Sequence, residues 1–101
     1  MLILKMMDLF ETYNYKTWVN QRIKAMAKKG RGQYRKIADF LNISPTIVTQ
    51  VFQNDRELTP EQAVLLAEYF GLTAIESRYF ILLVNYSRAG SFRYKAILKT
   101  D

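Results

Sequence analysis

The chain contains no cysteine and no histidine among its 101 residues. The absence of cysteine excludes disulfide bonds, thiolate metal ligands and thiol redox chemistry, and it is typical of cytoplasmic proteins, among which we expect this one. The absence of histidine excludes most zinc sites and the commonest general acid–base group. We therefore expect no metal, no cofactor and no enzymatic activity.

Long apolar runs are also missing, and none approaches the ~20 residues that a membrane-spanning helix needs. Half of the residues are nevertheless apolar, which is enough for a hydrophobic core. The length suits one domain and is too short for two. We expect a single domain over residues 1–101 that does not enter a membrane.

Acidic residues are absent from residues 12–38. The basic residues of this stretch are Lys16, Arg22, Lys24, Lys28, Lys29, Arg31, Arg35 and Lys36. Residues 39–76 have the opposite balance, because their only basic residue is Arg56 and their acids are Asp39, Asp55, Glu57, Glu61, Glu68 and Glu76. We interpret the basic stretch as a surface that faces a polyanion; the alternative is an ordinary solubilising surface.

Apolar periodicity and helix-boundary signals predict an all-α chain of five helices. The expected ranges are 15–28, 33–41, 45–54, 60–70 and 74–88. Gly71 is expected to end the fourth helix and Gly90 the fifth, because glycine is the preferred residue just past a helix. Residues 89–101 are then a tail, a sixth helix or the start of a further C-terminal region.

Three of the helices begin at recognisable caps. Ser44 is a suitable N-cap, and Pro45 follows it at the first helical position. The N–H group at that position has no partner within the helix, so proline, which has no N–H, loses no hydrogen bond there. Thr59 and Thr73 are each followed three residues later by Gln or Glu, the spacing of a capping box. Between the second and third helices, Asn42 suits the left-handed conformation that a tight reversal needs.

Residues 79–84, YFILLV, are consecutively apolar, so that composition alone allows a strand or a helix. The capping signal before them and the lack of a second candidate strand favour a helix. A helix that is apolar on every side must be covered on every side. We therefore expect Tyr79, Phe80, Leu83 and Tyr86 to contact a second copy of the chain or a missing C-terminal domain.

The third helix carries a polar stripe without charge. Thr46, Thr49, Gln50 and Gln53 follow the spacing i, i+3, i+4 and i+7, which places them on one face. Such side chains can read bases in the major groove, since Gln can form two bonds with adenine and the Thr methyl can contact the thymine methyl. The alternative is that they are ordinary surface residues.

The chain also resembles known proteins. The residues that carry the resemblance are Ile37-Ala38, Leu41, Ile43, Val48 and Val51, followed by LTPEQAVLLAEYFGL. With them, residues 33–72 resemble the Cro/CI-type (XRE-like) helix-turn-helix domain. Through DLFETYNYKTWV, RELTPEQA and ESRYFILLVNY, residues 8–88 are similar to a bacterial family of largely uncharacterised predicted transcriptional regulators, in which this domain precedes a longer C-terminal region.

The resemblance implies a lambda-repressor-like fold of five or six helices with the helix-turn-helix at the second and third. It implies sequence-specific binding of double-stranded DNA by a homodimer, with the third helix in the major groove. The implied base or groove-edge contacts are Ser44, Pro45, Thr46, Thr49, Gln50 and Gln53. Two residues depart from the pattern: Tyr34 replaces a phosphate-binding Gln, and Asn42 replaces the usual turn Gly.

Phosphate contacts are expected from the flanks of this motif, where a helix N-terminus offers free N–H groups beside basic side chains. The expected residues are Arg31, Gln33, Tyr34, Arg35, Lys36 and Arg56. For Arg56 the alternative is a surface ion pair with Asp55 or Glu57. The alternative function for the whole chain is an antitoxin-like or assembly module that binds a protein through the apolar fifth helix.

Overall fold

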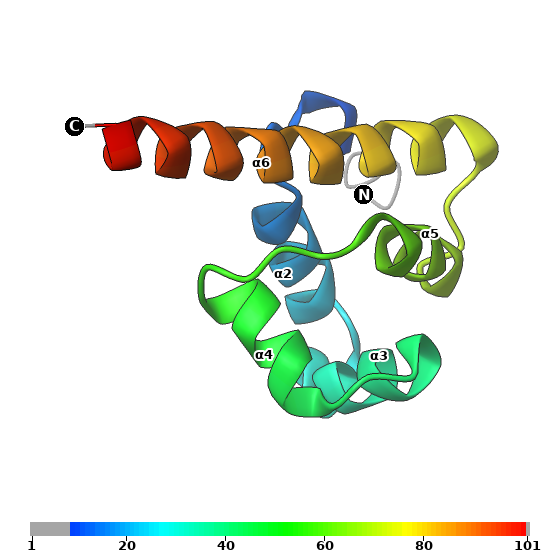
Figure 1. The fold of residues 1–101 in the computed structure, drawn as a ribbon. Coiled ribbons are helices and arrows are strands. Elements are labelled where there is room, and N and C mark those ends of the chain that lie inside the picture. Colours follow the sequence, from blue (N-terminus) through cyan, green and yellow to red (C-terminus); the bar gives the residue numbers. More distant parts are fainter. Residues whose placement is uncertain (1–8, 101) are drawn as a thin grey trace.

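In the computed structural model, residues 9–100 are described, except for the side chains of Lys29 and of residues 91–100. All regular structure in the described part of the chain is helical (Figure 1). Residues 9–11 are followed by α2 (Tyr15–Lys24), the 3-10 turn η1 (Ala27–Gly30), α3 (Gln33–Leu41), α4 (Pro45–Gln53), α5 (Pro60–Tyr69) and α6 (Ala74–Thr100). The predicted all-α class is confirmed.

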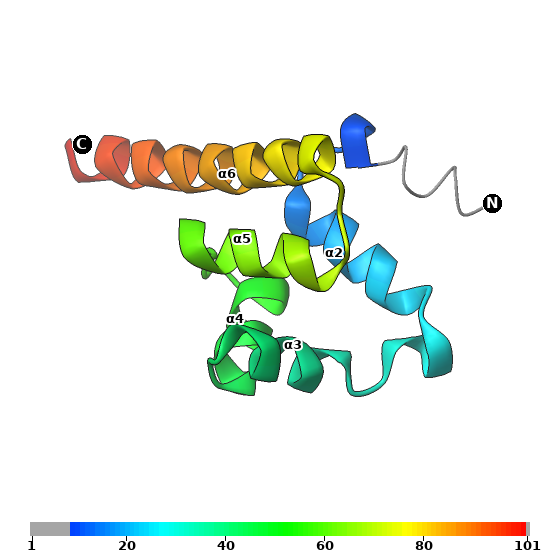
Figure 2. The same cartoon turned by 90° about the vertical axis from the view of Figure 1, so that its right-hand side faces the viewer.

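The longest helix, α6, lies across one side of the molecule, with α2 and α5 packed against it and α3 and α4 on the far side (Figures 1 and 2). Aromatic rings occupy the centre of the core between these layers. Tyr15 meets Phe52 and Phe80 edge-on, and Trp18 meets Phe70 and Phe80 in the same way. Offset geometry of this kind stabilises ring pairs beyond their burial.

The predicted helix caps are present. Ser44 accepts a hydrogen bond from an N–H group in the first turn of α4. Thr59 and Gln62 form a complete capping box at α5. At α6 the Glu76 carboxylate accepts the Thr73 N–H at 2.8 Å, and the Thr73 hydroxyl accepts the Glu76 N–H at 3.2 Å.

A three-residue turn, 42–44, joins α3 to α4. Asn42 is left-handed, with φ 58° and ψ 46°, which confirms the conformation predicted for it. The N–H of Asn42 bonds to the Asp39 carbonyl at 3.3 Å, and that of Ile43 bonds to the Ala38 carbonyl at 3.0 Å. These two bonds satisfy two of the carbonyls in the last turn of α3, and the turn brings α4 against α3.

The first predicted helix was too long. It ends at Lys24 instead of Lys28, and the chain continues through η1. The cause is a close approach of Gly30 to the last turn of α2, where a β-carbon on Gly30 would lie 2.4 Å from the Ile23 carbonyl oxygen. The chain must fold back onto Ile23 to make this contact, and a longer helix would carry it away.

The predicted end of the last helix was also wrong. Helix α6 continues through Gly90 to Thr100, so residues 89–100 are neither a tail nor a separate sixth helix. A single glycine costs only about 1 kcal/mol inside a helix. Residues 91–100 contain no proline or further glycine to break it. Asp101 lies outside the described residues.

Residues 79–84 are helical as predicted, but the partner predicted for Phe80 and Leu83 was wrong. These side chains are only 0% and 7% exposed, because α6 turns them into the core of its own chain. Tyr79 is half-buried, its ring lies tilted against that of Phe10 with 5.4 Å between the centroids, and its hydroxyl donates to the Thr12 carbonyl. Of the four residues expected at a partner contact, only Tyr86 is well exposed.

One polar junction connects α2, the α4–α5 loop and α6. The Tyr15 hydroxyl donates to Glu57 Oε1 at 2.9 Å and accepts the Leu58 N–H at 3.2 Å. The Ser87 hydroxyl donates to the same Glu57 oxygen at 2.9 Å, and Lys16 Nζ lies 3.6 Å from the other. Burial raises the pKa of Tyr15 above its usual value, with the neighbouring Glu57 acting in the same direction, so that its hydroxyl stays protonated.

Replacing Tyr15 by Phe should lower the free energy of unfolding by about 1–3 kcal/mol, because the buried Leu58 N–H and one Glu57 oxygen lose a partner. Urea denaturation measures this loss, and Tyr13→Phe on an exposed ring is the matched control. Because folding raises the pKa of Tyr15, its contribution is complete below about pH 10 and is lost at higher pH. The difference between wild type and Tyr15→Phe should therefore narrow in alkali; equal midpoints at neutral pH would contradict the assigned role.

Candidate nucleic-acid interface

The side of α4 that faces away from the core is polar and uncharged. We call Thr46, Thr49, Gln50 and Gln53 the polar face of α4. Thr46, Thr49 and Gln53 are exposed and Gln50 is half-buried. On the opposite side of the helix, the buried side chains are Val48, Val51 and Phe52. The polar face therefore offers hydroxyl and amide groups to solvent while the helix is held by its apolar side.

The hydroxyls at the start of α4 already have local partners. Ser44 accepts a bond from the backbone as the N-cap, and Thr49 donates its proton to the Pro45 carbonyl at 3.1 Å. Pro45 is exposed and has no N–H to offer. An external group would therefore meet Thr49 mainly as an acceptor, whereas Ser44 keeps its O–H proton as a donor, alongside the amides of the polar face.

The N-terminus of α3 lies at the edge of this surface. Its N-cap is Gly32, which provides no side-chain bond, and its first turn contains no acid. The Gln33 side chain is not free, since its oxygen accepts the Tyr69 hydroxyl at 2.8 Å. Exposed basic side chains surround the helix end: Arg31, Arg35 and Lys36. Backbone N–H groups and cations together make this a favourable place for an anion.

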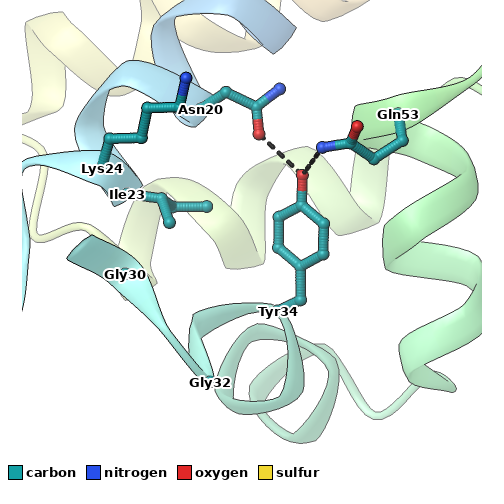
Figure 3. Close-up of a pocket in the computed structure, with 7 residues that line it drawn as sticks. All are labelled: Asn20, Ile23, Lys24, Gly30, Gly32, Tyr34 and Gln53. Atoms are coloured by element: carbon teal, nitrogen blue, oxygen red, sulfur yellow. Dashed lines mark hydrogen bonds between the residues drawn. The ribbon is translucent and has the colours of Figure 1, made fainter. Parts of the chain in front are cut away.

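Tyr34 points into a pocket instead of outward (Figure 3). Its hydroxyl donates to Asn20 Oδ1 at 2.7 Å and accepts from Gln53 Nε2 at 2.8 Å. The open pocket has a volume of about 500 Å³ and is lined by Asn20, Ile23, Lys24, Gly30, Gly32, Tyr34 and Gln53. A tyrosine has one hydroxyl proton. While Asn20 receives it, Tyr34 cannot donate to a phosphate, so the phosphate contact predicted for its side chain requires this bond to break.

Arg56 has neither of the acidic partners considered from the sequence. Its guanidinium donates to Gln50 Oε1 at 2.8 Å, across the C-terminal end of α4. Glu57 is instead bound at the junction with Tyr15. Arg56 is exposed, and a guanidinium has further N–H donors, so it can still bind a phosphate or a base.

Two basic residues of the stretch 12–38 serve the fold. Lys16 Nζ donates to the carbonyls of Asn54 and Arg56, at 3.1 and 2.7 Å, and thereby holds the chain that leaves α4. Arg22 lies over the Trp18 ring, 5.5 Å from its centre, where a cation is attracted to the aromatic face. No local sequence pattern distinguishes these residues from the exposed Lys24, Lys28, Arg31, Arg35 and Lys36.

Sequence reasoning missed Asn20, which connects α2 to the polar face. Its Nδ2 donates to the Phe52 carbonyl at 3.0 Å while its Oδ1 accepts from Tyr34. A lone asparagine on a helix carries no signal for such a contact, because the contact exists only once α2, α3 and α4 have packed.

No group of three or more acidic side chains that could hold a metal ion is present in the described part of the chain. No helix among the described residues is sufficiently long and apolar to span a membrane. Comparison with known proteins gives no match to a family model, a curated protein or a solved structure.

The two glycines of the pocket should respond differently to alanine, although both have a left-handed backbone with φ near 81°. Gly32→Ala adds a methyl group in open space, so that only backbone strain of about 1–2 kcal/mol is expected. Gly30→Ala adds a methyl group against the Ile23 backbone as well, and a loss of about 2–5 kcal/mol is expected. Urea midpoints measure both losses; equal losses would show that the close contact of Gly30 is unimportant.

Proposed function

We propose that the chain binds double-stranded DNA as a transcriptional regulator, with α3 and α4 acting as a helix-turn-helix of the lambda-repressor-like class. The observation that carries this proposal is the neutral polar face of α4, bordered by the basic N-terminus of α3. A surface helix that served only solubility would be expected to carry charged residues, whereas hydroxyls and amides match the base edges of the major groove.

In this proposal, different residues contact the phosphates and the bases. Arg31, Arg35 and Lys36, with the first N–H groups of α3, hold the phosphates irrespective of sequence. The polar face of α4 contacts base edges and supplies the sequence preference. The left-handed Asn42 supports the assignment, because it gives the tight reversal that places the second helix of such a motif across the first.

A second copy of the chain completes the proposal. One short helix reads only a few base pairs, so that a two-fold symmetric dimer on a partly palindromic site doubles the sequence information. The support for a contact on α6 is an apolar row of Ile75, Leu82 and Tyr86, which are 73%, 60% and 72% exposed. Their spacing of seven and four residues places them on one side of the helix.

The same row favours a second candidate function, a protein-interaction module whose working surface is α6. Exposed apolar side chains on one face are typical of protein interfaces. In that case the basic residues would keep the protein soluble, and DNA would not compete with the protein partner. The two candidates differ in whether duplex DNA binds at all, which one titration decides.

Binding to a random duplex should weaken as salt increases, with a log–log slope of roughly 0.9 for each phosphate contact. Arg35→Ala should lower the slope by about 1 and weaken all sequences alike, because it removes one such contact. Arg78→Ala is the control, since it removes the same charge from an exposed site on α6. Fluorescence anisotropy measures both; folded wild type that leaves duplex DNA unbound at low salt would disprove DNA binding and favour the protein-interaction module.

Leu82→Glu should abolish self-association without unfolding the chain, because Leu82 is exposed and its replacement puts charge into an apolar contact. Sedimentation measures the oligomeric state, and circular dichroism checks the fold. Val64→Glu, an exposed apolar position on α5, is the control and should leave the oligomeric state unchanged. Identical sedimentation of Leu82→Glu and wild type would rule out the proposed dimer contact.

A further inference from the structure

Two glutamines of the polar face form hydrogen bonds inside the protein through opposite ends of their side-chain amides. Gln50 is bound at its oxygen, Oε1, and Gln53 is bound at its nitrogen, Nε2. A glutamine amide accepts hydrogen bonds at Oε1 and donates them from Nε2. A partner inside the protein that fixes one end determines which group remains for an external ligand. The partners of these two side chains therefore decide what each can read.

At Gln50 the partner is Arg56, whose guanidinium lies 2.8 Å from Oε1. Arginine has donors only, so the end of the amide that faces it must be the oxygen. Both N–H groups of Gln50 are left for other acceptors. Because Arg56 is exposed and uses one donor on Gln50, the pair presents donors toward the outside.

At Gln53 the orientation follows from a chain of bonds that begins at a backbone carbonyl. The Phe52 carbonyl can only accept, so that Asn20 must turn its Nδ2 toward it and its Oδ1 toward Tyr34. Tyr34 then gives its one proton to Asn20, and its oxygen accepts from Gln53 Nε2 (Figure 3). Gln53 keeps a free oxygen and one N–H.

We propose that these opposite orientations make α4 a reader of two different purines, guanine at Gln50 with Arg56 and adenine at Gln53. In the major groove, guanine presents two acceptors, N7 and O6, which match an all-donor pair. Adenine presents one acceptor and one donor, N7 and the N6 amino group, which match the remaining N–H and oxygen of Gln53. In this assignment Arg56 positions Gln50, and Tyr34 with Asn20 positions Gln53.

The two purines are expected to lie close together on the DNA. Residues three apart on a helix are separated by about 4.5 Å along its axis, and base pairs are stacked about 3.4 Å apart. The two purines are therefore expected in neighbouring base pairs or with one pair between them. This inference rests on the proposed DNA binding, and for Gln50 it gives guanine in place of adenine, the base with which a free glutamine side chain can form two bonds.

Selection of bound sequences from a random duplex pool tests the assignment. The wild type should enrich a guanine and an adenine within about two base pairs. Arg56→Ala frees the Gln50 oxygen, and the preference for guanine should fall about tenfold while that for adenine is kept. Arg35→Ala is the control and should lower affinity without changing either preference. An equal loss of affinity for every sequence in Arg56→Ala would overturn the role given to Arg56, because that is the behaviour of a phosphate contact.

Tyr34→Phe tests the assignment of adenine to Gln53. The variant keeps the ring beside Phe52 and removes only the hydroxyl that holds Gln53. The preference for adenine should fall about tenfold and that for guanine should stay. The matched control is Tyr13→Phe, on an exposed ring that lies outside both proposed contact surfaces. Unchanged preferences in Tyr34→Phe would overturn the role of Tyr34.

A second variant avoids any effect of Tyr34→Phe on folding. Gln53 is exposed, and Gln53→Glu keeps the acceptor while it removes the donor. Preference at this position should shift from adenine to cytosine, whose N4 amino group donates. Retention of adenine would contradict the assignment. A wild-type motif without the guanine and adenine pair would overturn this inference alone, whereas absence of any duplex binding would overturn the proposed function as well.

Discussion

The fold depends on the buried hydroxyl of Tyr15, which lies where α2, the α4–α5 loop and α6 meet. Its ring packs edge-on against Phe52 of α4 and Phe80 of α6, so that one side chain joins three helices by apolar contact. The hydroxyl then requires a polar partner inside this core, and Glu57 provides it. Because an unpaired buried group costs about 1–3 kcal/mol, the loop that carries Glu57 is held in one position.

The same constraint extends to the polar face of α4. Lys16, the neighbour of Tyr15, holds the carbonyls just after α4, and Asn20, one turn further along α2, holds the last turn of α4 itself. The position of α4 is therefore set from α2 by three side chains on neighbouring turns. A surface that distinguishes bases must be held rigidly. Helix α2 does this for the polar face of α4, and the same helix carries Tyr15 in the core.

Local signals allowed much of this structure to be predicted from the sequence. The caps at Thr59 and Thr73 and the left-handed Asn42 depend on residues at most a few positions apart, and they were predicted correctly. The bond from Tyr15 to Glu57 joins residues 42 positions apart, and no local pattern contains it. The end of α2 was also not predicted, because the approach of Gly30 to Ile23 is visible only once the chain has folded back on the helix.

At the candidate interface, too, local features were predicted and contacts between distant residues were not. Spacing identified the polar face of α4, but it could not tell that Tyr34 and Arg56 bind the two glutamines of that face. These bonds determine which groups each glutamine can offer to a ligand. A glutamine without such a partner can rotate its amide to suit different bases, whereas one that is already hydrogen-bonded presents a fixed set of donors and acceptors. On the proposed function, the selectivity of α4 therefore depends on the side chains beside the helix as well as on its own sequence, because Arg56 and Tyr34 determine which groups the two glutamines present.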